Sequence, residues 1–286
     1  MSLAASLRTP AAGEQRRRRA DRVAILFMRA AAAVAVAPLI ALMLFVTLKA
    51  IPWLGITLFL NNPLDKEPGI QNAIIGSLQL SIAALLVSAP IGVVAGIYLS
   101  EYAPQRVASA GELLIDIMLG VPSIIAGLFA YLVLVPILGF SGWAAIVALS
   151  ILMIPVLMRT TQEVLRLVPQ GVKEASLALG IPVWKTTLFV TCRTAFSGIL
   201  TGLVLAFSRG LGETAPLILT ARGTNAANFL DFGTTMNAMP IVIFQYSNAA
   251  DSRSIGQAWA TALILLIIAL LLNVAVRGRS ITSKVA

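Results

Sequence analysis

AFSGILTGLVLAFSRGLGETAPLILTA, residues 195–221, is an apolar stretch whose only formal charges are Arg209 and Glu213. It is long enough to cross a bilayer, which takes a helix of about 20 mostly apolar residues. The whole chain of 286 residues has the same character, since 58% of its residues are hydrophobic and 12% are charged. Soluble domains have about 25% charged residues. The sequence therefore predicts an all-α membrane protein.

Apolar runs of sufficient length recur along the chain. The run at 117–158 is too long for one span, and the turn-rich segment ILGFSGW at 137–143 divides it into two. The sequence thus predicts a transmembrane domain at 22–286. Its six predicted transmembrane helices lie at about 23–49, 72–99, 113–138, 143–160, 188–221 and 255–277.

The basic residues gather on one predicted side of the membrane. Of 21 Lys and Arg residues, the predicted outer segments hold only Lys49, Lys66, Arg222 and Arg253. The positive-inside rule then places both termini in the cytoplasm. Residues 1–21 are predicted to form a basic cytoplasmic tail that is disordered or lies on anionic lipid. Because the charge follows the loops and not one soluble face, it indicates a lipid bilayer and no nucleic-acid partner.

The residue inventory argues against catalysis in this chain. The sequence has no His and a single cysteine, Cys192. It therefore lacks the commonest metal ligand and general base, and it cannot form an intramolecular disulfide. It also has no G-x-x-x-x-G-K-[ST] loop to cradle ATP phosphates. We expect no metal, no cofactor and no enzymatic activity, so any driving energy must come from a partner or from an ion gradient.

A proline and a glycine predict an interruption in the third span. Pro122 removes a backbone donor, and Gly120 loosens the preceding turn. Such breaks persist in membranes where they line a cavity or are buried in protein. Ser123 follows the break and could donate a hydrogen bond there, although Ser and Thr in membranes often bond their own helix.

A polar stretch between the fourth and fifth spans predicts a short helix outside the bilayer, at about 170–181. Pro169 and Pro182 bracket it, and Gly180 suits its C-terminal stop. An amphipathic helix resting on lipid headgroups is one interpretation. The small residues beside Glu174 equally favour close docking to a protein partner.

The charged pair in the fifth predicted span needs a structural or functional explanation, because charge is unfavourable in a bilayer. A charge near the bilayer centre costs about 3 kcal/mol, and residues four apart share a helical face. Arg209 and Glu213 can therefore pair and point together into a bundle or pore. The functional interpretation is that the Arg209 guanidinium binds an anion on leaving water. The alternative is an ion pair that only fixes helix packing.

Two further side chains are weaker pathway candidates. Thr214 follows Glu213 and could donate a hydroxyl hydrogen bond from a helix break. Arg159 lies at the predicted cytoplasmic end of the fourth span, where most arginines anchor a helix at the headgroups. The acidic residues Glu101, Glu112 and Asp116 are expected to be solvated or paired with Arg106.

The segment KEASLALGIPVWKT at 173–186 resembles the cytoplasmic EAA motif of ABC-importer permeases. Glu174, Ala175 and Gly180 match the motif, and Ser176 replaces its second Ala. The motif alone specifies only that superfamily.

Three further segments narrow the resemblance to the PstA family of phosphate permeases. They are LGVPSIIAGLFAYL at 119–132, RTTQEVLRLVP at 159–169 and GETAPLILTA at 212–221. The resemblance covers most of the chain from about 72 to 280.

The resemblance implies a type I ABC importer permease with the MetI-like fold, a multi-pass protein of the bacterial inner membrane. It implies a heterodimer with a homologous permease and an extracytoplasmic protein that delivers inorganic phosphate. It also implies two ATPase subunits, which bind ATP and Mg and dock on the coupling helix. The coupling residues would be Glu174, Ala175, Ser176, Leu177 and Gly180. The resemblance further suggests that Arg159 lines the inner exit of the substrate pathway.

Other function classes remain open. A permease for sulfate or molybdate would keep the importer class and change the anion. An ion-coupled secondary transporter predicts internal repeats and acidic sites within its spans, whereas Glu213 is the only deep carboxylate and no clear repeat is present. An intramembrane enzyme would need a catalytic His or paired carboxylates.

Overall fold

The computed structural model describes residues 12–226 and 229–282, which form helices joined by loops. Contacts divide the chain into two units, residues 1–49 and 50–286. The described part of the first unit belongs to α1 (Ala12–Ala50), a helix with Pro38 inside it. Residues 12–21 are helical and continuous with the predicted first span, so the alternative of a disordered tail is wrong for them, and the alternative of a tail that lies on anionic lipid stays a prediction. Their alanines and arginines are strong helix formers. Residues 1–11 lie outside the described residues.

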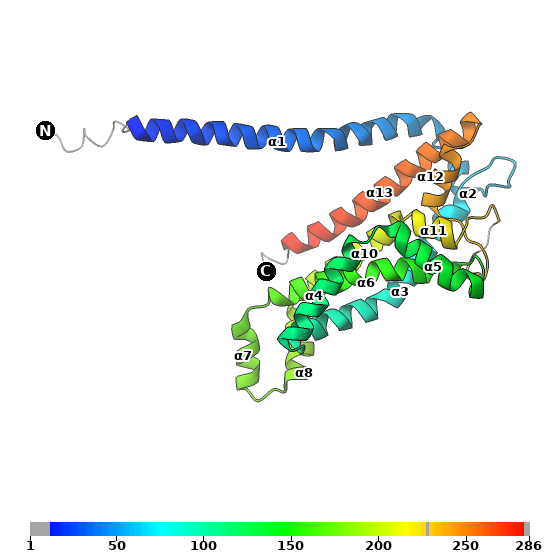
Figure 1. Cartoon of the computed structure of the whole chain (residues 1–286). Coiled ribbons are helices and arrows are strands. Elements are labelled where there is room, and N and C mark those ends of the chain that lie inside the picture. The colour runs from blue at the N-terminus through cyan, green and yellow to red at the C-terminus, as the bar shows by residue number, and fades with distance from the viewer. Residues whose placement is uncertain (1–11, 227–228, 283–286) are drawn as a thin grey trace. The chain divides into compact units, whose positions relative to one another are not determined.

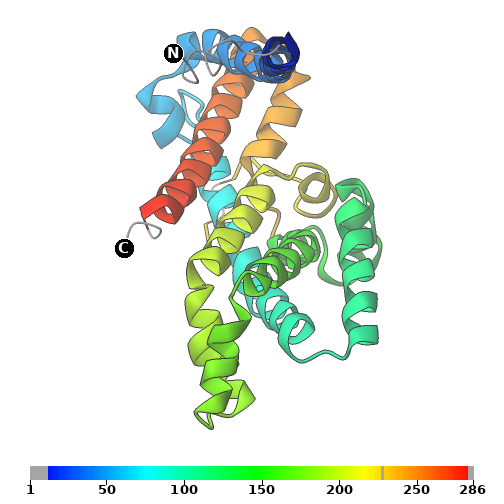
Figure 2. The same ribbon diagram turned by 90° about the vertical axis from the view of Figure 1, so that its left-hand side faces the viewer.

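The second unit contains the other helices (Figure 1). In chain order they are η1 (Ile51–Trp53), α2 (Ile56–Leu60), α3 (Gln71–Glu101), α4 (Gln105–Gly120), α5 (Ser123–Leu138), α6 (Gly142–Arg166), α7 (Gln170–Ala178), α8 (Val183–Lys185), the π-helix η2 (Thr186–Thr191), α9 (Cys192–Thr194), α10 (Phe196–Gly212), α11 (Ala215–Thr220), α12 (Met239–Ser247) and α13 (Ser252–Thr282). Within this unit α7 and α8 lie at one end, and α2 and α12 lie at the other (Figures 1 and 2). We call these the α7 end and the α12 end.

Between four and six segments can cross a membrane. Helices α1, α3, α6 and α13 are each long and apolar enough to do so. Two pairs meet the same criterion only together: α4 with α5, bent by 94°, and residues 183–194 with α10, bent by 70°. The six predicted spans are present if each bent pair counts as one span.

The third and fifth predicted spans are each divided into more than one helix in the structure. The third, predicted at 113–138, has its interruption at residues 121–122 as expected, but its first helix already begins at Gln105. The fifth, predicted as one helix over 188–221, is divided by the bend near Ala195 and again after Gly212. Pro216 explains the second division, because a proline clashes with the carbonyl four residues earlier, here that of Gly212.

Helix α6 is the centre of the second unit, and small residues let α3 approach it closely. The buried α3 residues that recur every four positions are Gly76, Leu80, Ala84, Ser88, Gly92 and Gly96. A Cβ atom at Gly92 would lie 2.6 Å from Leu157 Cβ and 3.0 Å from the Ile154 carbonyl oxygen of α6. The Ser150 hydroxyl of α6 also donates to the Ala84 carbonyl of α3 at 3.2 Å. Close contact through small residues is how membrane helices associate without a hydrophobic driving force.

Helix α10 packs against α6 by the same device. Its residues Gly198, Gly202, Ala206 and Gly210 also recur every four positions. The α6 side chains nearest to three of these glycines are Val164 at Gly198, Thr160 at Gly202 and Met153 at Gly210. The order is reversed along the two helices, so α10 runs antiparallel to α6.

At the α12 end, hydrogen bonds connect the 221–239 segment to α3 and α6. The Asn72 amide donates to the Thr224 carbonyl at 2.9 Å, and the Met239 N–H donates to the Ser77 hydroxyl at 2.7 Å. The N–H of Gly142, where α6 begins, donates to the Thr234 carbonyl at 3.0 Å. This segment therefore joins the first turns of α3 and α6.

Adding a side chain at the α3–α6 contact should destabilise the fold. We expect Gly92→Val to lower the free energy of unfolding by about 1–3 kcal/mol, because the α6 backbone must move to admit it. Thermal unfolding of the purified chain in detergent measures this change. The control is Gly171→Val, where a Cβ meets no atom within 4 Å. Equal melting temperatures for the two variants would contradict the packing argument.

Candidate functional site

The sequence-predicted charged pair lies at the C-terminal end of α10. Glu213 Oε1 is 3.4 Å from Arg209 Nε, and the side chains are 14% and 36% exposed. Glu213 follows the last residue of α10, where the backbone turns from helical to extended. The ion pair thus lies where the helix breaks.

The pair is deep within the apolar length of the bundle. Gly210, next to Arg209, contacts Met153, which lies near the middle of α6 (Gly142–Arg166). The break at Glu213 and Thr214 follows about one turn further toward the α12 end. Both groups are therefore at a depth where charge is costly unless it meets a partner, a ligand or water.

Two buried polar atoms, one on this arginine and one on the residue before it, have no hydrogen-bond partner. Although Arg209 Nε is within ion-pair distance of Glu213, it makes no hydrogen bond, and neither does the buried hydroxyl of Ser208. A buried donor left unsatisfied costs about 1–3 kcal/mol. The sequence analysis missed Ser208, whose only signal was its place beside Arg209. Two adjacent side chains thus offer unused hydrogen-bonding capacity at this depth.

The two helix breaks lie near each other. Gly127, on the first turns of α5, lies so close to α11 that a Cβ there would be 2.7 Å from Pro216 Cα. Ser123 is the first residue of α5, one turn before Gly127, and Thr214 precedes α11. The helix starts at Ser123 and at Thr214 are therefore neighbours, and both side chains are partly exposed. Neither hydroxyl caps its own helix.

Arg159 lies apart from this region. It is six residues beyond Met153 on α6, or about 9 Å along the axis. Its Nε is 2.8 Å from Glu163 Oε1, and its NH1 is 3.4 Å from Asp116 Oδ1 of α4. The Arg159 side chain is 37% exposed.

The expected pairing of the three α7-end acids with Arg106 is wrong. Asp116 pairs with Arg159, Glu112 with Arg166, and Glu101 with Lys173. These partners are 43, 54 and 72 residues away in sequence. The helix packing that brings them together is not visible in the local sequence.

The EAA-like segment forms α7 and the turn after it. Gly180 has φ +76°, a left-handed conformation that favours glycine and ends the helix. Ser176 is buried and its hydroxyl is 2.9 Å from the hydroxyl of Thr186 in η2. Glu174, Ala175 and Leu177 are exposed. The expected short helix is thus present. Its packed side includes Ser176, and its free side presents the exposed residues Glu174, Ala175 and Leu177.

The free side of α7 continues into an apolar surface. Leu167 before the helix and Leu179 after it are 79% and 80% exposed. Trp184 in α8 is also exposed. An apolar surface at the end of the bundle, away from its spanning length, is typical of a protein interface.

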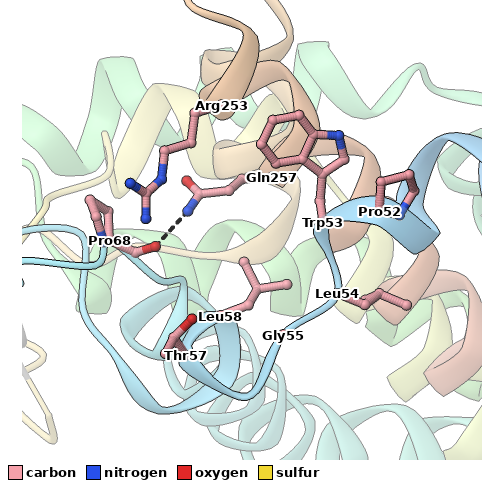
Figure 3. A pocket seen from close by; sticks show the side chains of 9 residues that line it. All are labelled: Pro52, Trp53, Leu54, Gly55, Thr57, Leu58, Pro68, Arg253 and Gln257. Atoms are coloured by element: carbon pink, nitrogen blue, oxygen red, sulfur yellow. Dashed lines mark hydrogen bonds between the residues drawn. The ribbon is translucent and has the colours of Figure 1, made fainter.

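A separate polar pocket of about 340 Å³ lies at the α12 end, between the η1–α2 segment and the start of α13 (Figure 3). Its walls include Trp53, Thr57, Arg253 and Gln257, and the Gln257 amide donates to the Pro68 carbonyl at 2.6 Å. Asp251 precedes this wall, and hydrogen bonds from the Ser254 backbone and hydroxyl lower the pKa of its carboxyl. No lining residue has a buried polar atom left without a partner, so this pocket is a weaker candidate than the Arg209 region.

Metal ligands do not gather in the described part of the chain. Over residues 12–226 and 229–282, no group of three His, Cys, Asp or Glu side chains could hold a metal ion. The chemistry that the Arg209 region offers is hydrogen bonding and charge, which suit the binding of an anion.

The chain is similar to permeases of bacterial import systems. Residues 88–278 match the family described as binding-protein-dependent transport system inner membrane component. The chain is 40% identical to the phosphate transport system permease protein PstA of Pasteurella multocida (strain Pm70) over 80% of this chain and 83% of that protein. It is 36% identical to the protein of the same name from Yersinia pestis over 91% of this chain and 90% of that one.

A solved structure with the same fold supports this relationship. The inward-facing MetNI methionine ABC transporter contains a chain that matches with a TM-score of 0.60 and 19% identity, over 76% of this chain and 96% of that one. The all-helical second unit thus has the MetI-like permease fold that the sequence resemblance implied. Taken with the curated relatives and the family match, this shows that the chain belongs to the PstA family of phosphate transport system permeases, multi-pass inner-membrane subunits of ABC importers.

Proposed function

We propose that this chain forms half of the translocation pore of an ATP-driven phosphate importer and that Arg209 contacts phosphate in transit. One observation carries the proposal: a guanidinium at mid-depth has a buried Nε without a hydrogen-bond partner, and the buried Ser208 hydroxyl beside it has none either. An oxyanion supplies the acceptor that the Arg209 Nε lacks. A hydrogen bond from a guanidinium to a phosphate oxygen joins two charged groups, and such bonds are stronger than those between neutral groups.

Glu213 then has two functions in the cycle. In the empty site its carboxylate, 3.4 Å from Arg209 Nε, offsets the arginine charge. With substrate present, the same carboxylate accepts the hydrogen of a protonated phosphate oxygen. Sulfate is fully ionised and has no such hydrogen. This mechanism selects phosphate over sulfate or molybdate without a size filter.

The neighbouring helix starts extend the pathway. Ser123 opens α5, whose first backbone N–H groups carry the positive end of the helix dipole. Thr214 adds a hydroxyl at the start of α11. Arg159 lies about 9 Å further toward the α7 end and marks the exit, where Asp116 and Glu163 compete with the anion for its guanidinium. The anion would leave the strong site for a weaker one.

The partners follow from the fold and the family. ABC importer permeases work with ATPase subunits and a substrate-binding protein, and this chain has no ATP-cradling loop of its own. We assign the α7 end and both termini to the cytoplasm, where two ATPase subunits with ATP and Mg would cover the exposed side of α7. A homologous permease completes the pore, and an extracytoplasmic phosphate-binding protein docks at the α12 end.

Removing the guanidinium should abolish transport and leave assembly intact. We expect Arg209→Gln to reduce phosphate uptake about 100-fold or more, because two hydrogen bonds to a charged group contribute about 1.5–3 kcal/mol each. Uptake of radiolabelled phosphate by proteoliposomes is the measurement. Arg106→Gln, which removes an exposed arginine of α4 away from the proposed pathway, is the matched control. Normal uptake by Arg209→Gln would leave the pair with a packing role only.

Neutralising the carboxylate should weaken discrimination between anions. We expect Glu213→Gln to lower the preference for phosphate over sulfate by about tenfold, because the glutamine amide can donate to sulfate. Competition of sulfate with phosphate uptake measures this ratio, with the exposed Glu67→Gln as control. An unchanged ratio would remove Glu213 from selectivity.

A charge on the free side of α7 should prevent ATPase binding. Leu177 is 44% exposed, so Leu177→Asp leaves the fold of the chain unchanged. We expect ATPase subunits to bind this variant about 30-fold more weakly, since a buried interface anchor contributes about 2 kcal/mol or more. Co-purification of the subunits tests this, with Leu64→Asp at the α12 end as control. Equal recovery of the ATPase with both variants would argue for the lipid-headgroup interpretation of α7.

A further inference from the structure

A largely buried ion pair connects α7 to the end of α3. Lys173, in the middle of α7, has its Nζ 2.7 Å from Oε1 of Glu101, the last residue of α3. The two side chains are only 15% and 10% exposed. The other ion pairs at this end, those of Arg159 and Arg166, have partners that are 33–59% exposed. Among the ion pairs given for the described residues at this end, the Lys173–Glu101 pair is therefore the best shielded from water.

Glu101 is in an unfavourable position without its partner. A carboxylate at a helix C-terminus meets the negative end of the helix dipole, and burial removes its hydration. Lys173 offsets both effects. Removing either side chain leaves the other as a shielded, unpaired charge, so the position of α7 and the end of α3 depend on each other.

A second contact joins the same face of α7 to the helix that carries the charged site. Ser176 is three residues after Lys173, so both side chains lie on one face of α7. The Ser176 hydroxyl is 2.9 Å from that of Thr186 in η2, and η2 continues through α9 into α10. Through its packed face, α7 thus contacts both α3 and the segment that leads to Arg209.

We propose that Lys173 and Glu101 are positioning residues that transmit the displacement of α7 to α3, in addition to the route through α10. This inference rests on the proposed function, because it takes α7 as the element that the ATPase subunits move. Helix α3 is 31 residues long, or about 46 Å. At its far end, Asn72 and Ser77 form hydrogen bonds with Thr224 and Met239 of the 221–239 segment. A displacement at Glu101 is carried toward the α12 end by one helix, which contains Pro90 but is not divided there, whereas α10 ends at Gly212.

The test compares single variants with a charge exchange. Lys173→Met and Glu101→Gln each remove one charge at similar side-chain length, and the double variant Lys173→Glu with Glu101→Lys restores a pair with the charges exchanged. Arg106→Met removes an exposed cation of α4 at the same end and is the control. The complete complex, with its ATPase and binding protein, is reconstituted in proteoliposomes. Phosphate uptake and ATP hydrolysis are measured in the same vesicles.

We expect both single variants to retain ATP hydrolysis within about twofold of the unmodified complex and to lose about tenfold in phosphate transported per ATP hydrolysed. The exchanged pair should recover at least half of that ratio, and the control should keep all of it. An unchanged ratio in the single variants would overturn the proposal. A double variant no better than the single ones would also overturn it, because the charges would then act separately.

A second readout does not depend on phosphate. Backbone hydrogen exchange of residues 170–181 in the assembled complex should be about tenfold faster in each single variant and return toward the unmodified rate in the exchanged pair. If the unmodified complex hydrolyses ATP without response to phosphate, the proposed function fails, yet this exchange pattern can still be present. If phosphate stimulates the complex but exchange is the same in all variants, the link between α7 and α3 fails alone.

Discussion

A guanidinium at mid-depth in an apolar bundle is the constraint on which the rest of this structure depends. Arg209 lies near the level of Met153 in the middle of α6, and one carboxylate at 3.4 Å does not satisfy its buried Nε. Two helix breaks, at residues 121–122 and 213–214, are neighbours, and the second directly follows the Arg209–Glu213 pair. Irregular backbone at this depth is stable only where it is buried in protein or lines a cavity.

The small residues on α3 and α10 make this arrangement possible. Both helices present them every four positions to α6, so three backbones approach closely along most of their length. These close contacts fix the position of α6 relative to α3 and α10, and the interrupted segments α5 and α11 pack against α6.

The sequence predicted the parts of this structure that depend on local composition. Apolar run length located the helices that can cross a membrane, Pro122 located the break between α4 and α5, and Pro169, Pro182 and Gly180 bounded α7. Other features depend on packing between distant segments. The bend near Ala195, the π-helix at 186–191 and the partners of Glu101, Glu112 and Asp116 leave no periodic signal in the chain. Within the candidate site, spacing by four was sufficient to predict the contact between Arg209 and Glu213, whereas the unpaired Ser208 hydroxyl required coordinates.

The apolar surface around α7 has a consequence for how cells maintain this protein. Leu167, Leu179 and Trp184 remain uncovered in an isolated copy, and such surfaces attract chaperones and proteases. A copy synthesised in excess of its ATPase would then be degraded, while an assembled copy would persist. Subunit stoichiometry can thus be set by the lifetime of orphan chains, without matched rates of synthesis.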